Sequence, residues 1–305
     1  MSDVGKLNRG AAYAAIAVAS LLAGLKLWAV WSTQSTAMLG SLADTALDLV
    51  ASLATLAGVW IAAQPADDEH RFGHGKAEAL SAMFQVVLIS ISALTLAVRA
   101  AGQLLAGARP AGASEGILVS GIAIVATLGL LAWQRRVIAR TGSIAISTDH
   151  LHYKSDLLLN LAVIAALALD QYAGLPGADA VFGFVIALWL GWGAWHASAE
   201  AINHLMDREW PDDRKARFLE VVARHPELKG LHDLRTRTSG NHDFVQFHMS
   251  VNPDMTVRDA HAVMDEIEAK LAKEFPGTEF LIHPDPEGLI NETGLAAQNL
   301  LAGRG

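Results

Sequence analysis

Cysteine is absent from this chain of 305 residues. Disulfide bonds and thiolate metal sites are therefore excluded, and any metal ion must be held by histidine, aspartate, glutamate or backbone oxygen. Charge is also scarce, since Lys, Arg, Asp and Glu make up 18% of the residues, whereas soluble domains average roughly 25%. The formal net charge of −8 argues against a nucleic-acid partner, which would require a basic surface.

The few charges are unevenly distributed along the chain. Residues 1–205 carry 11 Lys and Arg and 13 Asp and Glu, whereas the residues from 206 onward carry 12 and 18. This contrast predicts a membrane domain over residues 1–205 and a soluble, acidic domain over residues 206–288. The remaining residues, 289–305, are expected to form a flexible tail.

Six apolar runs are long enough to cross a bilayer, which takes roughly 20 helical residues. The first run contains Lys26 and is too long for the apolar part of a signal peptide, so we interpret it as a membrane span as well. Lys and Arg cluster between alternate runs, and the positive-inside rule then places both termini in the cytoplasm. The predicted spans lie near residues 11–31, 37–63, 79–105, 114–134, 144–170 and 179–203.

The pattern beyond residue 205 is typical of a small soluble domain, because segments with helical periodicity alternate with segments that have the strand period of two. Thr256 is expected to cap the second helix. The order helix, strand, strand, helix, strand (αββαβ) predicts a two-layer α+β domain. The expected elements cover residues 212–228, 231–240, 242–251, 256–275 and 278–285.

Two acidic residues lie inside the second apolar run. Asp44 and Asp48 are four residues apart, so their carboxylates share one face of a helix, and an acid at the centre of a membrane helix costs about 2.5–3.5 kcal/mol. The fifth run carries a second pair with this spacing, His152 and Asp156. Three carboxylates and one imidazole suit a divalent cation in tetrahedral coordination. A single acid could instead be structural, paired for example with Lys154, but two such pairs favour the metal site.

Sequence motifs surround these residues. The second run reads SLADTALDLVASLATLAGVW and is followed by PADDEHRFGHGKAEAL, and the fifth run contains DHLHYKSDLLLN. Together they resemble the cation diffusion facilitators, in particular the bacterial zinc transporters and ferrous-iron efflux pumps, over about residues 8–288. The resemblance implies six transmembrane helices, a cytoplasmic ferredoxin-like domain and a homodimer in the inner membrane. It also implies a secondary active transporter, not an enzyme, that exports Zn²⁺, Cd²⁺ or Fe²⁺ in exchange for protons by alternating access.

The resemblance assigns ligands to a transport site, with zinc as the favoured ion, and to a second site in a loop. The transport site consists of Asp44, Asp48, His152 and Asp156. The loop site consists of Asp67, His70 and His74. By the residues alone this loop could equally be a polar connector in contact with water, and Gly73 and Gly75 argue for a loop over a helical turn.

A third group of ligands is implied in the soluble domain, where structural or regulatory zinc would join the two subunits. It consists of His232, His248, His261, His283 and Asp285. Pro284 departs from the family pattern, in which glutamine is expected, and proline keeps only its backbone carbonyl as a possible ligand. The resemblance further implies a charge interlock between Lys76 and Asp207 and a hydrophobic gate at Leu151.

Two other functions are considered as alternatives. An intramembrane metalloprotease would need an activating carboxylate beside an open zinc position, commonly as an HExxH motif, and the sequence contains none. A membrane protein that senses metal and signals through its soluble domain without transport is compatible with the same residues. Zinc flux into sealed liposomes would distinguish a transporter from both alternatives.

Overall fold

The structure of the protein is a computed structural model. This structure describes residues 3–33, 36–106, 117–173, 177–225, 229–240 and 242–288. The chain divides into two compact units, Met1–Leu205 and Met206–Gly305. Residues 289–305, predicted to be a flexible tail, lie outside the described residues.

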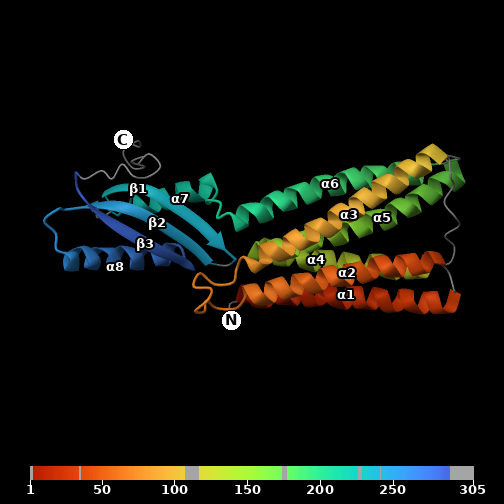
Figure 1. The fold of residues 1–305 in the computed structure, drawn as a ribbon, viewed down its shortest axis with the longest axis horizontal. Helices are drawn as coiled ribbons and strands as arrows, with labels where there is room; N and C mark the ends of the chain where they lie inside the picture. The colour runs from red at the N-terminus through yellow and green to blue at the C-terminus, as the bar shows by residue number, and fades with distance from the viewer. Residues whose placement is uncertain are drawn as a thin grey trace. The chain divides into compact units, whose positions relative to one another are not determined.

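Within the described part of the first unit, the chain forms six long helices (Figure 1). They contain between 25 and 31 residues, more than the roughly 20 needed to cross the apolar core of a bilayer. Among the described residues, five of these helices meet both the length and the composition of a membrane span; they are α1, α2, α3, α4 and α6. The bounds of the six are α1 (Asp3–Thr33), α2 (Thr36–Ala62), α3 (Ala77–Ala106), α4 (Ile117–Thr141), α5 (Ile144–Ala173) and α6 (Ala178–Leu205).

Helix α4 extends beyond the fourth apolar run. The predicted span ended at residue 134, whereas the helix continues to Thr141. Arg135, Arg136 and Arg140 occupy this added segment, and arginine is a good helix former that does not need an apolar environment. The first residues of the predicted span, 114–116, lie outside the described residues.

Helix α5 contacts all five other helices of the bundle. Its first half is largely buried and carries the polar side chains of Asp149, His152 and Ser155. Polar groups within a membrane domain face the interior, because exposing them to lipid is costly. The central position of α5 in the bundle therefore suits the polar side chains of its first half.

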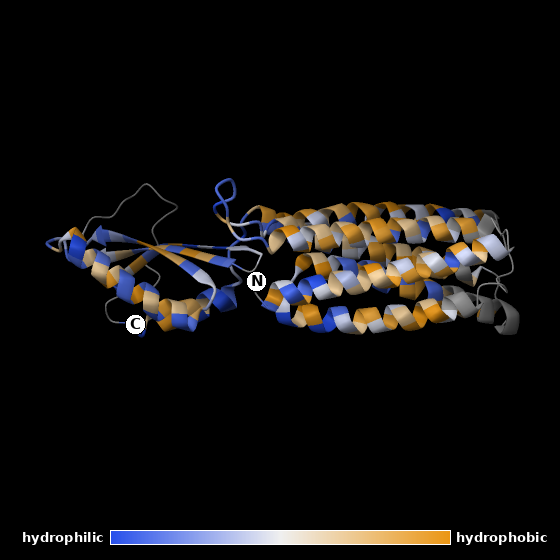
Figure 2. Ribbon diagram, turned by 90° about the horizontal axis from the view of Figure 1, so that it is seen from below, coloured by the Kyte–Doolittle hydropathy of each residue, from blue (hydrophilic) through white to orange (hydrophobic). Residues whose placement is uncertain are grey.

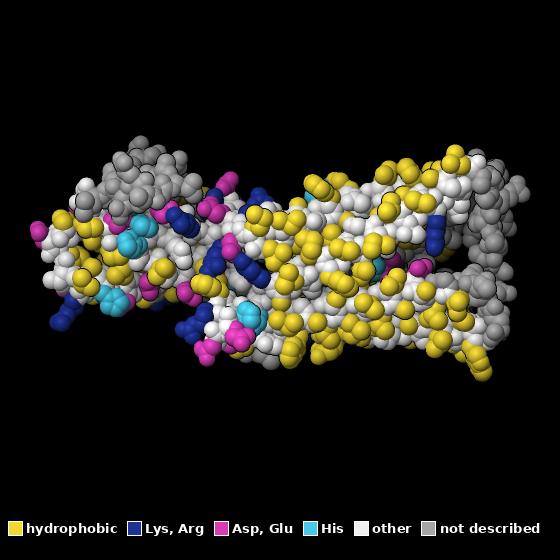
Figure 3. Space-filling view, in the orientation of Figure 1, with side chains coloured by type: hydrophobic (Ala, Val, Ile, Leu, Met, Phe, Trp, Pro, Cys, Tyr) yellow, Lys and Arg dark blue, Asp and Glu magenta, His cyan; other side chains and the backbone are white. Residues whose placement is uncertain are grey.

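The helices of the bundle are rich in hydrophobic residues (Figure 2), and many apolar side chains lie on the face that Figure 3 shows. Large apolar side chains are exposed there, for example Trp31 at 76% and Val125 at 72%. Soluble proteins seldom expose apolar patches of this extent, whereas a bilayer requires them.

Inside the bundle the helices approach closely, since a Cβ atom added to Gly58 of α2 would collide with the side chain of Ser81 on α3.

As far as the second unit is described, it contains two helices and a three-stranded sheet in the order α7, β1, β2, α8, β3. The predicted fold class, membrane helices followed by a small α+β domain, is therefore confirmed. β1 and β2 pair antiparallel. β2 and β3 pair parallel, and α8 supplies the crossover that a parallel pair requires. The elements are α7 (Asp212–Val222), β1 (Lys229–Ser239), β2 (His242–Val251), α8 (Val257–Glu274) and β3 (Thr278–Pro286).

The core of this unit lies between the two helices and one face of the sheet. Phe218 of α7, Ile267 of α8 and Phe247 of β2 belong to one cluster of fully buried side chains. Thr256 caps α8 as predicted, because its hydroxyl accepts a hydrogen bond from the backbone N–H of Asp259 at 3.2 Å. Helix α7 is shorter than predicted, and residues 226–228 lie outside the described residues.

Candidate metal centres

The first site lies inside the helix bundle and joins α2 to α5. His152 Nε2 lies 2.9 Å from Asp48 Oδ1 and 3.8 Å from Asp156 Oδ2. One ligand atom from each of these residues lies within 4.8 Å of the other two. His152 is 7% exposed, so its ring is shielded and its Nε2 faces the two carboxylates. Three of the four residues predicted for the transport site are therefore brought together.

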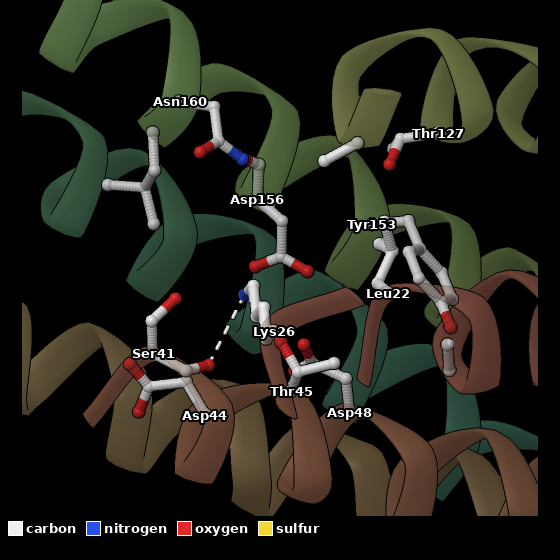
Figure 4. Close-up of a pocket in the computed structure, with 13 residues that line it drawn as sticks. Leu22, Lys26, Ser41, Asp44, Thr45, Asp48, Thr127, Tyr153, Asp156 and Asn160 are labelled. Carbon is white, nitrogen blue, oxygen red and sulfur yellow. Dashed lines mark hydrogen bonds between the residues drawn. The ribbon is translucent and has the colours of Figure 1, made fainter. Parts of the chain in front are cut away.

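A cavity of about 240 Å³ adjoins this group (Figure 4). Asp44, Asp48 and Asp156 line it, so the fourth predicted ligand, Asp44, faces the same space although it is not one of the three residues whose atoms lie within 4.8 Å. One water molecule occupies about 30 Å³ in the liquid, so the cavity has room for a partly hydrated ion.

Lys26 of α1 lines the same cavity and is not one of the predicted site residues. Its Nζ donates to the backbone carbonyl of Ser41 at 3.2 Å and to the hydroxyl of Thr45 at 2.5 Å. These acceptors belong to the turn of α2 that carries Asp44. In the sequence, a lysine inside an apolar run could have indicated a functional residue, but the sequence does not show which helix its side chain reaches.

A second buried acid, Asp149, precedes His152 on α5 and is also not among the predicted residues. It is 0% exposed. Its Oδ1 accepts from Nε2 of Gln85 on α3 at 3.0 Å, and its Oδ2 accepts from Nε2 of Gln134 on α4 at 2.7 Å. One carboxylate thus connects three helices and fixes the part of α5 that precedes His152. In the sequence, the two glutamines inside apolar runs could have indicated that a buried polar partner such as Asp149 exists.

The neighbours of His152 on α5 also hold the helix in place. Tyr153 shares a hydrogen bond of 2.9 Å with the hydroxyl of Ser52 on α2. Leu151, the predicted gate, faces α6, where a Cβ atom added to Gly193 would lie 3.0 Å from its Cδ2. Leu151 therefore fills the space that the missing side chain of Gly193 leaves.

The predicted loop site lies between α2 and α3, where the chain is not helical, as Gly73 and Gly75 suggested. Asp67 lies between two imidazoles: its Oδ1 is 3.5 Å from His70 Nδ1 and its Oδ2 is 3.3 Å from His74 Nε2. The backbone N–H of His70 donates to Asp67 at 2.7 Å and lowers the pKa of Asp67 below its ordinary value. The structure thus brings the three residues together.

The two residues of the predicted interlock belong to different units. Lys76 Nζ donates to the backbone carbonyl of Leu205 at 3.1 Å. Asp207 Oδ2 lies 3.8 Å from Nη1 of Arg237, and its φ of 55° is in the left-handed region, which is uncommon for a residue other than glycine. The interlock itself stays a prediction.

The register of the sheet aligns the histidines of the second unit. His248 on β2 pairs with His232 on β1 and with His283 on β3, and residues in register share one face of a sheet. Asp285 is buried among them: its carboxylate lies 3.2 Å from His232 Nε2, 2.8 Å from His248 Nδ1 and 3.4 Å from His283 Nε2. Four of the five predicted residues therefore form one cluster.

The fifth predicted residue, His261, is not part of this group within the described chain. It lies on α8 with 70% of its side chain exposed, and its Nε2 is 3.7 Å from Asp265 Oδ2. Pro284 pairs in register with the core residue Met249, so its side chain lies on the face opposite to the histidines. Asp233, which was not predicted, lies 3.7 Å from His248 Nε2.

Comparisons with known proteins cover nearly the whole chain. The family model described as the cation efflux transmembrane domain matches residues 12–206, and the one described as the cytoplasmic domain of cation efflux proteins matches residues 210–287. The cation-efflux pump FieF of Cronobacter sakazakii is 42% identical over 288 residues, which are 94% of this chain and 96% of that protein.

The FieF pump of Klebsiella pneumoniae is 40% identical over 286 residues, which are 94% of this chain and 95% of that protein. A solved structure, the cytosolic domain of a cation diffusion facilitator family protein, is 28% identical, with a TM-score of 0.24, and covers 25% of this chain and 93% of that one. The family matches and the identity to full-length relatives show that the chain belongs to the cation efflux family of membrane transporters, the cation diffusion facilitators.

Proposed function

We propose that this transporter exports zinc across the inner membrane of a bacterium in exchange for protons, as a homodimer with alternating access. The observation that carries the proposal is the group of Asp48, His152 and Asp156, whose ligand atoms lie within 4.8 Å of one another on two helices of the bundle. Ionisable side chains are costly inside a membrane, and a captured divalent cation offsets this cost. Asp44 completes the ligand set from the wall of the cavity.

Zinc is the cargo that these ligands favour. Zn²⁺ commonly takes four ligands in tetrahedral geometry and accepts both imidazole nitrogen and carboxylate oxygen, whereas Mg²⁺ and Ca²⁺ prefer oxygen alone. Fe²⁺ and Cd²⁺ are competing cargoes. Outward transport is supported by relatives that are named cation-efflux pumps.

Exchange with protons follows from the chemistry of the ligands. Zinc binds deprotonated imidazole and carboxylate, so zinc binding releases protons and protonation releases zinc. His152 can carry a proton when zinc is absent, because an imidazole nitrogen binds either a metal ion or a proton. Protons that move inward thereby drive zinc outward. Rigid-body rocking of helix groups would alternate the access to the site, as in other secondary transporters.

We also propose how the chain is oriented in the membrane and how it is divided into domains. Residues 1–205 form the transmembrane domain, and residues 206–288 form a cytoplasmic domain. Arg135, Arg136 and Arg140 at the end of α4 support this orientation, since Lys and Arg are enriched on the cytoplasmic side. Both termini then face the cytoplasm.

A resident zinc ion fits the cluster of the cytoplasmic domain. His232, His248 and Asp285 offer ligand atoms within 4.8 Å of one another, and imidazole with carboxylate is a ligand set that zinc accepts. The face that carries them is open, since Leu281 beside His283 is 61% exposed. A second copy of the chain could cover this face, and zinc bound there would stabilise the dimer.

The proposal is tested with the full-length protein in sealed liposomes that contain a zinc-sensitive dye. Zinc is added outside, and a lumen made more acidic than the outside should accelerate zinc entry, because protons leave as zinc enters. A flux that does not respond to the pH gradient would exclude proton exchange. Zinc binding without any flux would favour the metal sensor, and parallel runs with Fe²⁺ and Cd²⁺ would rank the cargoes.

A further inference from the structure

Lys26 places a positive charge in the cavity of the transport site (Figure 4). The side chain comes from α1, whereas the carboxylates come from α2 and α5. Its Nζ donates to the carbonyl oxygen of Ser41 and to the hydroxyl of Thr45. Both acceptors are neutral, and Thr45 is buried. The ammonium group is therefore anchored on the turn of α2 that carries Asp44 by groups that are not metal ligands.

The charges that line the cavity match one divalent ion. Asp44, Asp48 and Asp156 supply three negative charges when they are ionised, and Lys26 supplies one positive charge, which leaves a sum of −2. A single divalent cation brings this sum to zero. Because uncompensated charge inside a membrane is costly, the set as a whole favours one divalent ion over a monovalent or a trivalent one.

We propose that Lys26 is a built-in counter-cation that matches the transport site to one divalent ion and keeps its affinity low enough for release. The ammonium repels the metal ion and so weakens the binding that the carboxylates provide. A transport site needs affinity that is sufficient for loading and still permits unloading. This inference rests on the proposed function of Asp48, His152 and Asp156 and adds a residue from α1 to it.

A structural tie between α1 and α2 is the competing explanation for Lys26. Such a tie would act only through the hydrogen bonds to Ser41 and Thr45, and its loss would lower the thermal stability without raising the zinc affinity. A charge-repelling role predicts the opposite change in affinity. Equilibrium zinc binding therefore separates the two roles, and the thermal unfolding midpoint serves as the second measurement.

The test is isothermal titration calorimetry of zinc binding to the full-length protein in detergent. The transport-site component is the one that Asp48→Asn removes. We expect Lys26→Met, which is unbranched and one atom shorter but uncharged, to lower the Kd of this component about tenfold, equivalent to about 1.4 kcal/mol. The same variant should release zinc more slowly and reduce the maximal flux into liposomes. Lys26→Arg, which keeps the charge, should behave like the wild type.

An unchanged or weaker zinc affinity in Lys26→Met, with Lys26→Arg as its matched control, would overturn the inference. If Lys26→Met does not yield folded protein, Lys26→Gln is measured in its place and judged by the same criterion. Failure of the proposed function is a different result, because Asp48→Asn would then leave both zinc binding and zinc flux unchanged.

Discussion

His152 Nε2 lies 2.9 Å from Asp48 Oδ1, and this contact joins α5 to α2 inside the helix bundle. The two residues are 104 positions apart in the sequence. Since each helix contributes side chains that could hold a metal ion, a bound ion would hold α2 and α5 together, and loss of the ion would let them separate. Such a link between occupancy and helix arrangement is what a ligand needs in order to shift a conformational equilibrium.

Replacing Gln134 should destabilise the bundle through Asp149. Gln134→Leu removes the donor at 2.7 Å from Asp149 Oδ2 and leaves a buried carboxylate oxygen without that partner, which costs about 1–3 kcal/mol. The expected result is a thermal unfolding midpoint lower by several degrees in detergent. Gln103→Leu, an exposed position on α3, is the control; equal midpoints for the two variants would contradict this role of Asp149.

The contact between Leu151 and Gly193 tests the predicted gate. Gly193→Ala would place a methyl group 3.0 Å from Cδ2 of Leu151, so Leu151 must shift. We expect a reduced zinc flux with an unchanged zinc affinity, because the substitution alters the path of the ion but none of its ligands. Gly191→Ala, where nothing lies within 4 Å of the added Cβ, should transport zinc like the wild type. Equal flux in both variants would argue against a gate at Leu151.

The histidine cluster of the second unit should bind zinc and strengthen the dimer. His232→Ala removes an imidazole 3.2 Å from Asp285, so we expect less zinc bound per chain and weaker association of subunits in analytical ultracentrifugation. His242→Ala changes an exposed histidine of β2 and should have neither effect. Chelation should weaken the wild-type dimer; a dimer that is indifferent to chelation and to His232→Ala would contradict the assignment.

The loop site should lose zinc as the pH falls, and histidine should set the range. The lowered pKa of Asp67, caused mainly by the N–H of His70, keeps this carboxylate ionised below its ordinary titration range. Free imidazole has a reference pKa of about 6.5, well above that of a carboxylate, so acid should displace zinc through the imidazoles before Asp67 takes up a proton. Zinc affinity should be constant above this range and fall below it. The measurement is a zinc titration at several pH values, from which the component of binding that Asp67→Ala removes is taken.

The lowered pKa of Asp67 also determines how the stability of the folded loop depends on pH. Because the pKa of Asp67 is lowered in the folded loop, ionised Asp67 stabilises that loop above its unfolded pKa, and this contribution is lost as the pH falls through the folded pKa. Loss of zinc at a pH well below the histidine range, in step with Asp67, would contradict the assignment of His70 and His74 as ligands.

Local spacing made much of the site predictable. The pairs Asp44 with Asp48 and His152 with Asp156 share a helix face because a helix repeats every three to four residues, and the structure places three of the four within reach of one ion. The αββαβ order was also predictable, since strand and helix periodicities differ. In both cases the information is contained in a few neighbouring residues.

Contacts between distant segments were not predictable from this single sequence. Lys26 reaches α2, and Asp149 receives two glutamines from two other helices; which helices pack together is a tertiary property that spacing does not encode. The alignment of His232, His248 and His283 depends on strand register, and β1 is irregular between Lys229 and Arg235. A shift by one residue would move a histidine to the other face of the sheet.

Zinc flux into liposomes by Asp48→Asn tests the central claim most directly. The substitution keeps the shape of the side chain but removes a carboxylate that lies 2.9 Å from His152, and Glu200→Gln, an exposed acid on α6, is the control. If Asp48, His152 and Asp156 bind the transported ion together, Asp48→Asn should reduce flux to the level of empty liposomes while Glu200→Gln transports like the wild type. Wild-type flux in folded Asp48→Asn protein would contradict the account.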